Sequence, residues 1–203
     1  PLLQSSAASD VYKRQGSGKS AAASFFKNEG INVIDADHVA KEVVEKDTPG
    51  FRKVVEYFGA EIIHADGSID RAKLRKEVFE SIEKRGVLES ITHPLVREKM
   101  SERILASQSP YSIIEVPLIF ETKSMSSYDR VLVIDCESKL QLERAALRDK
   151  NSSEVIQNII NSQCSREERL SIANDVISNN DSLKNLQIRS LAMHHFYLGL
   201  ARQ

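Results

Sequence analysis

The sequence predicts an α/β protein in which helices cover an open parallel β-sheet. Three observations lead to this fold class. Short apolar runs alternate with longer helix-forming stretches, as in repeated βα units. The run at 129–136, DRVLVIDC, is almost continuously apolar, which is typical of a parallel strand buried on both faces. The sequence GSGKS at 16–20 precedes an Ala-rich helical stretch and suggests a phosphate-binding turn at a helix start.

Composition limits the classes of function. With 203 residues the chain forms one domain, or one domain with an inserted lid. Its 28 basic and 29 acidic residues give no reason to expect a nucleic-acid or membrane partner. We find no membrane-spanning run and no signal peptide, so we expect a cytoplasmic protein whose two cysteines, Cys136 and Cys164, are reduced thiols. The sequence leaves the oligomeric state open.

The predicted strands are short, apolar and rich in β-branched residues, and they lie at 31–37, about 112–116, 129–136 and 174–180. Gly30 provides a stop for the helix before the first of them. Capping boxes at Ser138 and Ser165 predict two helix starts. Residues 51–108 are charged and helix-prone, which predicts a helical insert plus one core helix.

The glycines of the 16–20 turn allow backbone amides to point inward and hold an anion. Lys19 would then reach the β- and γ-phosphates of a nucleotide, and Ser20 would bind Mg²⁺. The alternative is a flexible Ser/Gly linker. The helix that follows, and the strand after it that ends in acids, form the context that a phosphate site requires and disfavour a linker.

Two aspartates, Asp35 and Asp37, follow the first predicted strand. If both lie on the strand, their side chains point to the same side, toward the crevice at the carboxyl ends of the strands. One of them could accept a proton from an attacking hydroxyl. Equally, Asp37 could be the N-cap of the next helix, and both roles can hold together.

Several basic residues are weaker candidates. Arg144 and Arg148 lie four apart on one predicted helix and would share a face suited to a transferring phosphoryl group, although most such arginines are solvated or salt-bridged. Arg71 lies at an edge of the helical insert, and His93, before a proline, is more typical of a turn. We assign no chemistry to the histidine pair at 194–195.

Taken in order, these segments resemble the dephospho-CoA kinase family. The similar segments are GSGKS, GINVIDAD, YFGAEIIHADGSIDRAKLRKEVF, ITHPLVRE, VPLIFE, DRVLVIDC with QLERAALRD, and QCSREERLSIANDVISNN. They extend from Gly16 to the C-terminus in the family's order and spacing. The resemblance implies a P-loop kinase core with a parallel five-stranded sheet, a helical substrate-binding insert at about 51–108 and an arginine-bearing lid at about 138–165.

The resemblance also implies that ATP donates its γ-phosphate to the ribose 3′-hydroxyl of dephospho-CoA. Lys19 and Ser20 would serve ATP and Mg²⁺, together with the backbone of Gly16, Ser17 and Gly18. Asp37 matches the acid beside the acceptor hydroxyl.

For the remaining positions, Arg148 matches the lid arginine, with Arg144 in support. Arg71 and His93 fall in substrate-domain segments, and Asn179 lies in the segment that matches the adenine-side loop. Where the family tends to carry two acids, this chain has Asn174-Asp175.

Residues 1–15 depart from the family, which has a hydrophobic strand followed by Thr-Gly-Gly-Ile-Gly-Ser-Gly-Lys. Here agreement begins abruptly at Gly16. We therefore expect residues 1–15 to be foreign to this gene, so that the first strand is replaced and the chain is unstable or weakly active. Three functions stay open: an active kinase, a nucleotide-binding remnant without catalysis, and a kinase of another small acceptor.

Overall fold

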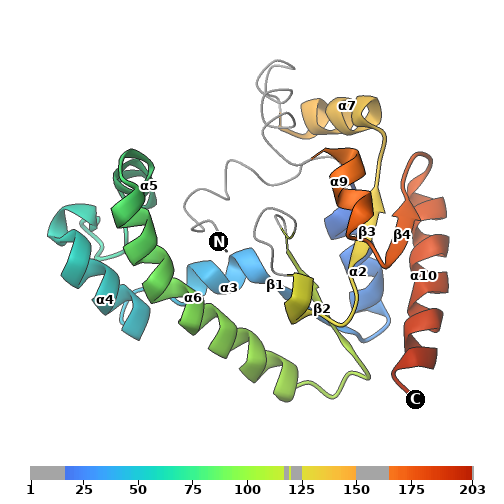
Figure 1. The fold of residues 1–203 in the computed structure, drawn as a ribbon, viewed down its shortest axis with the longest axis horizontal. Coiled ribbons are helices and arrows are strands. Elements are labelled where there is room, and N and C mark those ends of the chain that lie inside the picture. Colours follow the sequence, from blue (N-terminus) through green and yellow to red (C-terminus); the bar gives the residue numbers. More distant parts are fainter. Residues whose placement is uncertain (1–16, 117–118, 120–124, 150–164, 203) are drawn as a thin grey trace. The chain divides into compact units, whose positions relative to one another are not determined.

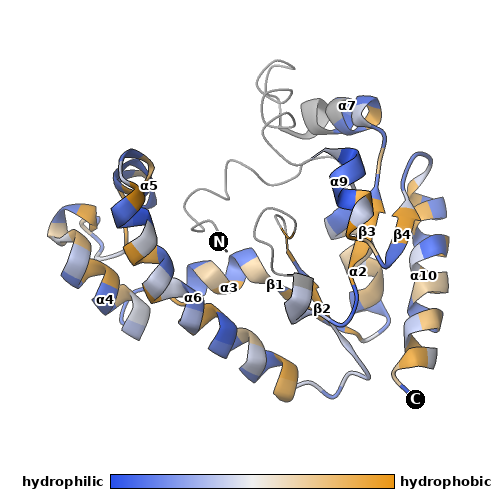
Figure 2. Cartoon of the chain, in the orientation of Figure 1, coloured by the Kyte–Doolittle hydropathy of each residue, from blue (hydrophilic) through white to orange (hydrophobic). Residues whose placement is uncertain are grey.

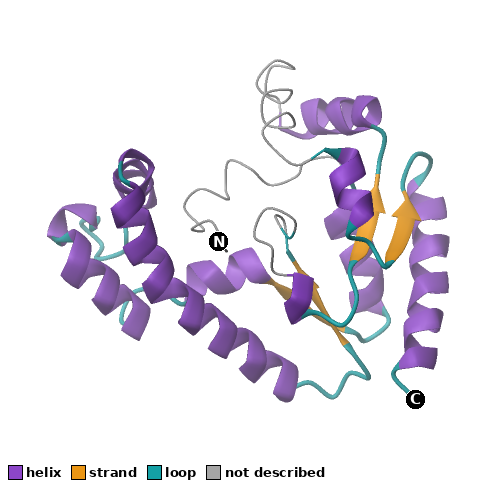
Figure 3. Ribbon diagram, viewed as in Figure 1, coloured by secondary structure: helices purple, strands orange, loops and turns teal. Residues whose placement is uncertain are grey.

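The computed structural model describes residues 17–116, 119, 125–149 and 165–202. These residues divide into two compact units, and each unit is described by itself. The first contains residues 17–33 and 107–202, and the second contains residues 34–106. The chain alternates helices and strands in the first unit, whereas the second is helical apart from the end of one strand (Figures 1 and 3).

The first unit contains β2, the β3–β4 pair, the first half of β1 and the helices that pack on these strands. Its elements are α2 (Lys19–Asn28), β1 (Asn32–Asp35), β2 (Ser112–Glu115), the short helix η2 (Met125–Ser127), β3 (Leu132–Asp135), α7 (Ser138–Asp149), α9 (Arg166–Ser171), β4 (Asp175–Ser178) and α10 (Leu183–Leu200). Strand β1 starts in this unit and leads into the second. All four strands predicted from the sequence are therefore confirmed, each within its predicted range.

The described strands form two separate pairs, β1–β2 and β3–β4. The second pair is parallel, with Leu132 opposite Asp175 and Asp135 opposite Ser178. A fifth strand is expected directly before the 16–20 turn, and that position lies outside the described residues. Asp135 of β3 is buried and the other three residues of this strand are half-buried, while Val131 and Cys136 on either side of it are buried, so burial of the strand on both faces stays a prediction. Its one partner among the described strands is β4.

A small apolar core holds α2 and α10 against the β3–β4 pair. Its buried members are Ala22 of α2, Ile177 of β4 and Leu186 of α10. Half-buried hydrophobic residues surround them: Ala21, Phe25, Leu132, Ile134 and Met193. Burial of one leucine side chain stabilises a fold by about 1.5–3 kcal/mol, so these contacts fix the start of α2 relative to the strands. The strands are apolar in Figure 2, whereas α9 is mostly hydrophilic.

Polar contacts join the beginnings of β3 and β4. The guanidinium of Arg130 donates two hydrogen bonds to the carboxylate of Asp175, at 2.8 and 2.9 Å. These bonds, and a third from the Tyr197 hydroxyl at 2.8 Å, lower the pKa of Asp175. The side-chain oxygen of Asn174 accepts from the Val131 amide at 2.8 Å. The pair Asn174-Asp175 thus fixes the register at which the two strands start.

The two predicted capping boxes have different outcomes. Ser165 caps α9, and the Glu168 carboxylate accepts a hydrogen bond from the Ser165 amide, as predicted. The prediction at Ser138 is wrong, because α7 already includes Ser138. Its first intrahelical bond runs from the Gln141 amide to the Glu137 carbonyl, which makes Glu137 the residue that precedes the helix.

The second unit is a cluster of helices around one long helix. It contains α3 (Ala36–Glu42), α4 (Pro49–Phe58), the short helix η1 (Ala60–Ile62), α5 (Arg71–Glu80) and α6 (Ile82–Leu105), and α6 contacts α3, α4 and α5. Its core consists of buried aliphatic residues, among them Val39, Val54, Ile62, Leu74, Val78, Leu88 and Val96. Within the described ranges, no helix is both long enough and apolar enough to cross a lipid bilayer.

Gly18, at the start of α2, packs against Asn179 in the loop that follows β4. It is the N-cap of α2 and has φ 87°, a left-handed conformation that side chains disfavour. A Cβ atom added here would lie 2.1 Å from the side-chain nitrogen of Asn179 and 3.2 Å from its Cγ. Both the backbone conformation and the close approach of Asn179 therefore require glycine.

We expect Gly18→Ala to destabilise the first unit. The left-handed backbone alone costs roughly 1–2 kcal/mol with a side chain, and displacement of the Asn179 amide adds to that cost. Urea unfolding of the variant measures the loss. The matched control is Gly199→Ala in α10, where no atom lies within 4 Å of the added Cβ and alanine favours the helix by roughly 0.5–1 kcal/mol. A Gly18→Ala chain as stable as the wild type would contradict the packing described here.

Candidate active site

Polar residues gather at the carboxyl ends of the strands in the first unit. Glu115 is the last residue of β2, Asp135 is the last of β3, and Asn179 directly follows β4. The N-terminus of α2 contacts the first and the third of these residues. In open α/β sheets this edge forms the ligand crevice.

The start of α2 presents backbone N–H groups in the way that anion sites do. The first N–H groups of a helix have no partner within it, and Gly18 has no side chain with which to cap them. Ser17, just before the helix, is buried. The structure thus places Ser17, Gly18, Lys19 and Ser20 together, whereas Gly16 lies outside the described residues.

Lys19 and Ser20 share one carboxylate oxygen of Glu115. The Lys19 ammonium lies 3.3 Å from Glu115 Oε1, and the Ser20 hydroxyl donates to the same oxygen at 2.9 Å. Glu115 was not among the site residues predicted from the sequence. The signal was present, because an acid ends the strand predicted at 112–116, and the carboxyl ends of parallel strands face one crevice.

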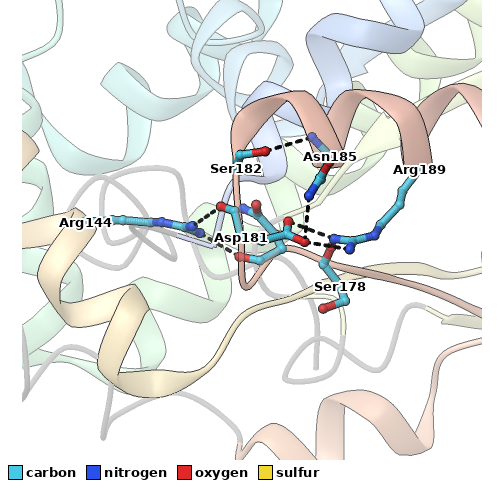
Figure 4. A network of polar contacts seen from close by, with 7 residues as sticks. Arg144, Ser178, Asp181, Ser182, Asn185 and Arg189 are labelled. Atoms are coloured by element: carbon cyan, nitrogen blue, oxygen red, sulfur yellow. Dashed lines mark hydrogen bonds and ion pairs between the residues drawn. The ribbon is translucent and has the colours of Figure 1, made fainter.

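Asn179, in the loop after β4, contacts the chain just before α2, and Arg144 contacts the same loop. The Asn179 amide nitrogen donates to the Ser17 carbonyl at 2.8 Å. Arg144 donates to the backbone carbonyls of Asn179, at 2.7 Å, and Asp181, at 3.0 Å (Figure 4). The guanidinium of Arg144 therefore holds the loop after β4. The side chain of Arg148, one turn further along α7, lies outside the described side chains.

Arg166, at the start of α9, is a cation that sequence reasoning also missed. Its guanidinium donates two hydrogen bonds to the buried carboxylate of Asp135, at 2.8 and 2.6 Å. These bonds raise the pKa of Arg166, so the residue stays charged. Its position directly after the cap residue of a predicted helix gave no hint of this contact, which depends on the end of β3 lying beside α9.

Cys136 lies next to this group as a buried free thiol. Burial raises its pKa, although the neighbouring Arg144, whose Nη1 is 3.5 Å from the sulfur, acts in the opposite direction. The thiol is therefore protonated at neutral pH, in agreement with its expected role as an ordinary reduced cysteine. Cys164 lies outside the described residues.

Asp35 and Asp37 do not lie on one strand, so that prediction is wrong. Strand β1 ends at Asp35 and α3 begins at Ala36. The carboxylate of Asp35 accepts from the amides of Asp37, at 2.9 Å, and His38, at 3.1 Å. Asp35 is therefore the N-cap of α3, the position for which the sequence had suggested Asp37. Asp37 lies in the first turn of α3 and is buried.

Arg71 and His93, like Asp37, belong to the second unit. Arg71 is the first residue of α5, and its guanidinium donates to the Lys41 carbonyl at 3.4 Å. His93 is half-buried within α6 and does not lie in a turn. The helix continues through Pro94, which has no N–H to donate to the carbonyl four residues earlier. A proline after histidine was therefore a poor indicator of a turn here.

Comparison with known sequences identifies the family. A family model described as dephospho-CoA kinase matches residues 15–185. A dephospho-CoA kinase from gamma-proteobacterium EBAC31A08 is 46% identical over 188 residues, which cover 93% of this chain and 95% of that protein. A dephospho-CoA kinase from Mannheimia succiniciproducens is 42% identical and covers 93% of this chain and 90% of its own.

Comparison with solved structures supports the same fold. A crystal structure from Thermus thermophilus is similar with a TM-score of 0.76 at 26% identity, covering 89% of this chain and 92% of that one. Dephospho-CoA kinase from Campylobacter jejuni is similar with a TM-score of 0.65 at 29% identity, covering 88% and 90%. The α/β kinase fold predicted from the sequence is thus confirmed, and the chain belongs to the dephospho-CoA kinase family of ATP-dependent phosphotransferases.

Proposed function

We propose that this chain transfers the γ-phosphate of ATP to the ribose 3′-hydroxyl of dephospho-CoA and so forms coenzyme A. The observation that carries the proposal is the uncapped start of α2, with Lys19 and Ser20 on it, at the carboxyl ends of the strands. The names of the most similar relatives support the choice of acceptor.

ATP binding would use the backbone amides at the start of α2 as donors to the phosphates, aided by the helix dipole. Lys19 would leave Glu115 and neutralise the β- and γ-phosphates. Arg148 of α7 is our candidate for the lid arginine that stabilises charge on the transferring group, with Arg144 holding the loop beside it.

Mg²⁺ fits between Ser20 and Glu115. A hydroxyl and a carboxylate oxygen that already lie 2.9 Å apart are oxygen donors of the kind that this cation prefers. When bound, the ion would neutralise charge on the phosphate oxygens. Ser20 and Glu115 would hold it, directly or through water.

Asp37 is our candidate for the general base. It lies in the first turn of a helix, where the dipole favours a carboxylate, and the cap made by Asp35 fixes the backbone of that turn. It would accept the proton of the 3′-hydroxyl as the oxygen bonds to the γ-phosphorus and the bond to ADP breaks. Arg71 and His93 are our candidates for binding dephospho-CoA.

The assay that tests this proposal couples ADP release to dephospho-CoA, with a panel of nucleotide acceptors beside it. We expect turnover with dephospho-CoA and none with nucleoside monophosphates. Asp37→Asn should lower kcat by roughly 10²–10⁴-fold, because proton transfer in the transition state is lost, with little change in the KM for ATP.

Asp35→Asn is the matched control for Asp37→Asn, because asparagine also caps helices and the fold is kept. Equal losses in the two variants would contradict the role of Asp37. Turnover with a nucleoside monophosphate in place of dephospho-CoA would favour a kinase of another small acceptor. ATP binding without any phosphorylated product would indicate the inactive remnant, for which the comparisons give no support.

We expect Ser20→Ala to raise the Mg²⁺ concentration needed for half-maximal activity, because one oxygen ligand is lost. Titration of the rate with Mg²⁺ at saturating ATP measures this. The matched control is Ser24→Ala, one turn along α2, where the hydroxyl donates to the Ala21 carbonyl at 2.7 Å. If both variants shift the titration equally, Ser20 is not a ligand.

We also propose that residues 1–15 are foreign to this gene. The match to the family model begins at residue 15, and the N-terminal sequence lacks the strand and glycines of the family. Replacing residues 1–15 with a β-branched strand followed by Thr-Gly-Gly-Ile should raise both turnover and the unfolding temperature. Equal turnover of the two chains would overturn the proposal, as would genomic reads that run unbroken through the codons for residues 15 and 16.

A further inference from the structure

We propose that Asn179 is a positioning residue for the triphosphate. Its side chain orients the Ser17–Gly18 peptide so that the Gly18 N–H faces the phosphates of ATP. This inference rests on the proposed function, because it concerns the same nucleotide site. It differs from the role expected by resemblance, in which the segment around Asn179 lies beside the adenine.

The donor and the acceptor of the hydrogen bond between Asn179 and Ser17 are both defined. The Asn179 side-chain nitrogen lies 2.8 Å from the Ser17 carbonyl oxygen. A carbonyl only accepts hydrogen bonds, so the amide nitrogen is the partner that must face it. Asn179 is 5% exposed and Ser17 is 4% exposed, so water does not compete for this bond.

This bond fixes the direction of the next N–H. The carbonyl of Ser17 and the N–H of Gly18 belong to one planar trans peptide group, in which they point in opposite directions. With the carbonyl held by Asn179, the N–H of Gly18 points to the other side. A free Gly18 peptide could rotate, because glycine tolerates several backbone conformations. Asn179 therefore fixes the direction of the Gly18 N–H, at a position where the glycine backbone alone would allow the peptide to rotate.

Packing reinforces the hydrogen bond. The Asn179 amide occupies the space that a Cβ on Gly18 would need, with the side-chain nitrogen only 2.1 Å from that position. A flip of the Ser17–Gly18 peptide would turn its N–H toward the N–H groups of this amide and would leave the amide without its acceptor. An unsatisfied buried donor costs about 1–3 kcal/mol, so the observed orientation is strongly preferred.

The backbone of Asn179 is itself held on both sides. Its amide donates to the Asp135 carbonyl of β3 at 2.7 Å, and its carbonyl accepts from Arg144 of α7 at 2.7 Å. The loop is thus anchored to a strand and to the helix that bears Arg148. These bonds fix the position of Asn179 without a bound nucleotide. Its side chain can therefore hold the Ser17–Gly18 peptide in one orientation.

A second arginine supports the next part of the loop. Arg189 of α10 donates to the Ser178 carbonyl at 2.8 Å and makes two hydrogen bonds to the Asp181 carboxylate, at 3.0 and 2.7 Å. Figure 4 shows Arg144 and Arg189 approaching this loop from two helices. One N–H of the Asn179 side-chain amide is thus directed at the Ser17 carbonyl of the phosphate turn.

The test compares three ligands: ATP, inorganic tripolyphosphate, which has no base, and adenosine, which has no phosphate. We replace Asn179 with leucine, which has a similar size and no donor. Affinities for ATP and tripolyphosphate should fall about tenfold, the effect of misplacing one donor to a charged group, while the affinity for adenosine stays unchanged. Calorimetry or competition against a fluorescent nucleotide measures all three.

The matched control is Asn185→Ala on α10, which removes a 3.1 Å hydrogen bond to Asp181 without touching the phosphate turn. It should leave all three affinities unchanged. An equal loss of adenosine affinity in Asn179→Leu would show a base contact and overturn the inference, as would unchanged binding of tripolyphosphate. If the wild-type chain binds neither ATP nor tripolyphosphate, the proposed function itself fails.

Thermal unfolding shows whether the leucine variant is folded, and adenosine binding confirms it independently. If Asn179→Leu does not fold, Asn179→Ser takes its place, since a serine hydroxyl is too short to reach the Ser17 carbonyl. The serine variant is expected to give the same selective loss of phosphate affinity. Affinities equal to those of the wild type would overturn the inference.

Discussion

The contact of the buried Asn179 side chain with Ser17 and Gly18 is the constraint on which the proposed nucleotide site depends. It joins the two residues that precede α2 to the loop after β4 through a hydrogen bond to the Ser17 carbonyl, 162 positions away in the chain, and a close approach to Gly18. Because Gly18 is left-handed, α2 can begin directly at the carboxyl ends of the strands. The uncapped N–H groups, Lys19 and Ser20 all take their positions from this start. Any change that moves Asn179 is therefore expected to move the proposed phosphate site as well.

Sequence patterns predicted the strands well, because short apolar runs bounded by polar residues carry their own signal. The phosphate turn was predictable for the same reason, since its residues are adjacent in the chain. The contacts of Glu115 and Arg166 were not, because each depends on how strand ends and helix starts come together in space. Local capping was mispredicted at Asp37 and Ser138, where the helix boundary differed by one or two residues from the one assumed.

Arg144 makes contacts that its residue type and spacing did not predict. Its spacing from Arg148 suits phosphate binding, yet its guanidinium donates to the Asn179 and Asp181 carbonyls. Carbonyl oxygens at the end of a strand need donors when they lack strand partners, and a planar guanidinium satisfies two at once. The Arg144 guanidinium therefore positions the backbone of the loop after β4. The observed role of Arg144 is thus to hold the loop after β4.

The ion pair of Lys19 with Glu115 would favour a nucleotide bound as its magnesium complex in the proposed site. Lys19 already has a carboxylate partner in Glu115, so a bare triphosphate would have to separate this pair and would leave Glu115 facing further negative charge. Ser20 and Glu115 would hold a divalent cation, whose positive charge would remove that repulsion. Lys19, no longer needed as the partner of Glu115, would then be available to the phosphates. The shared oxygen of Glu115 thus links the proposed roles of Lys19 and Ser20.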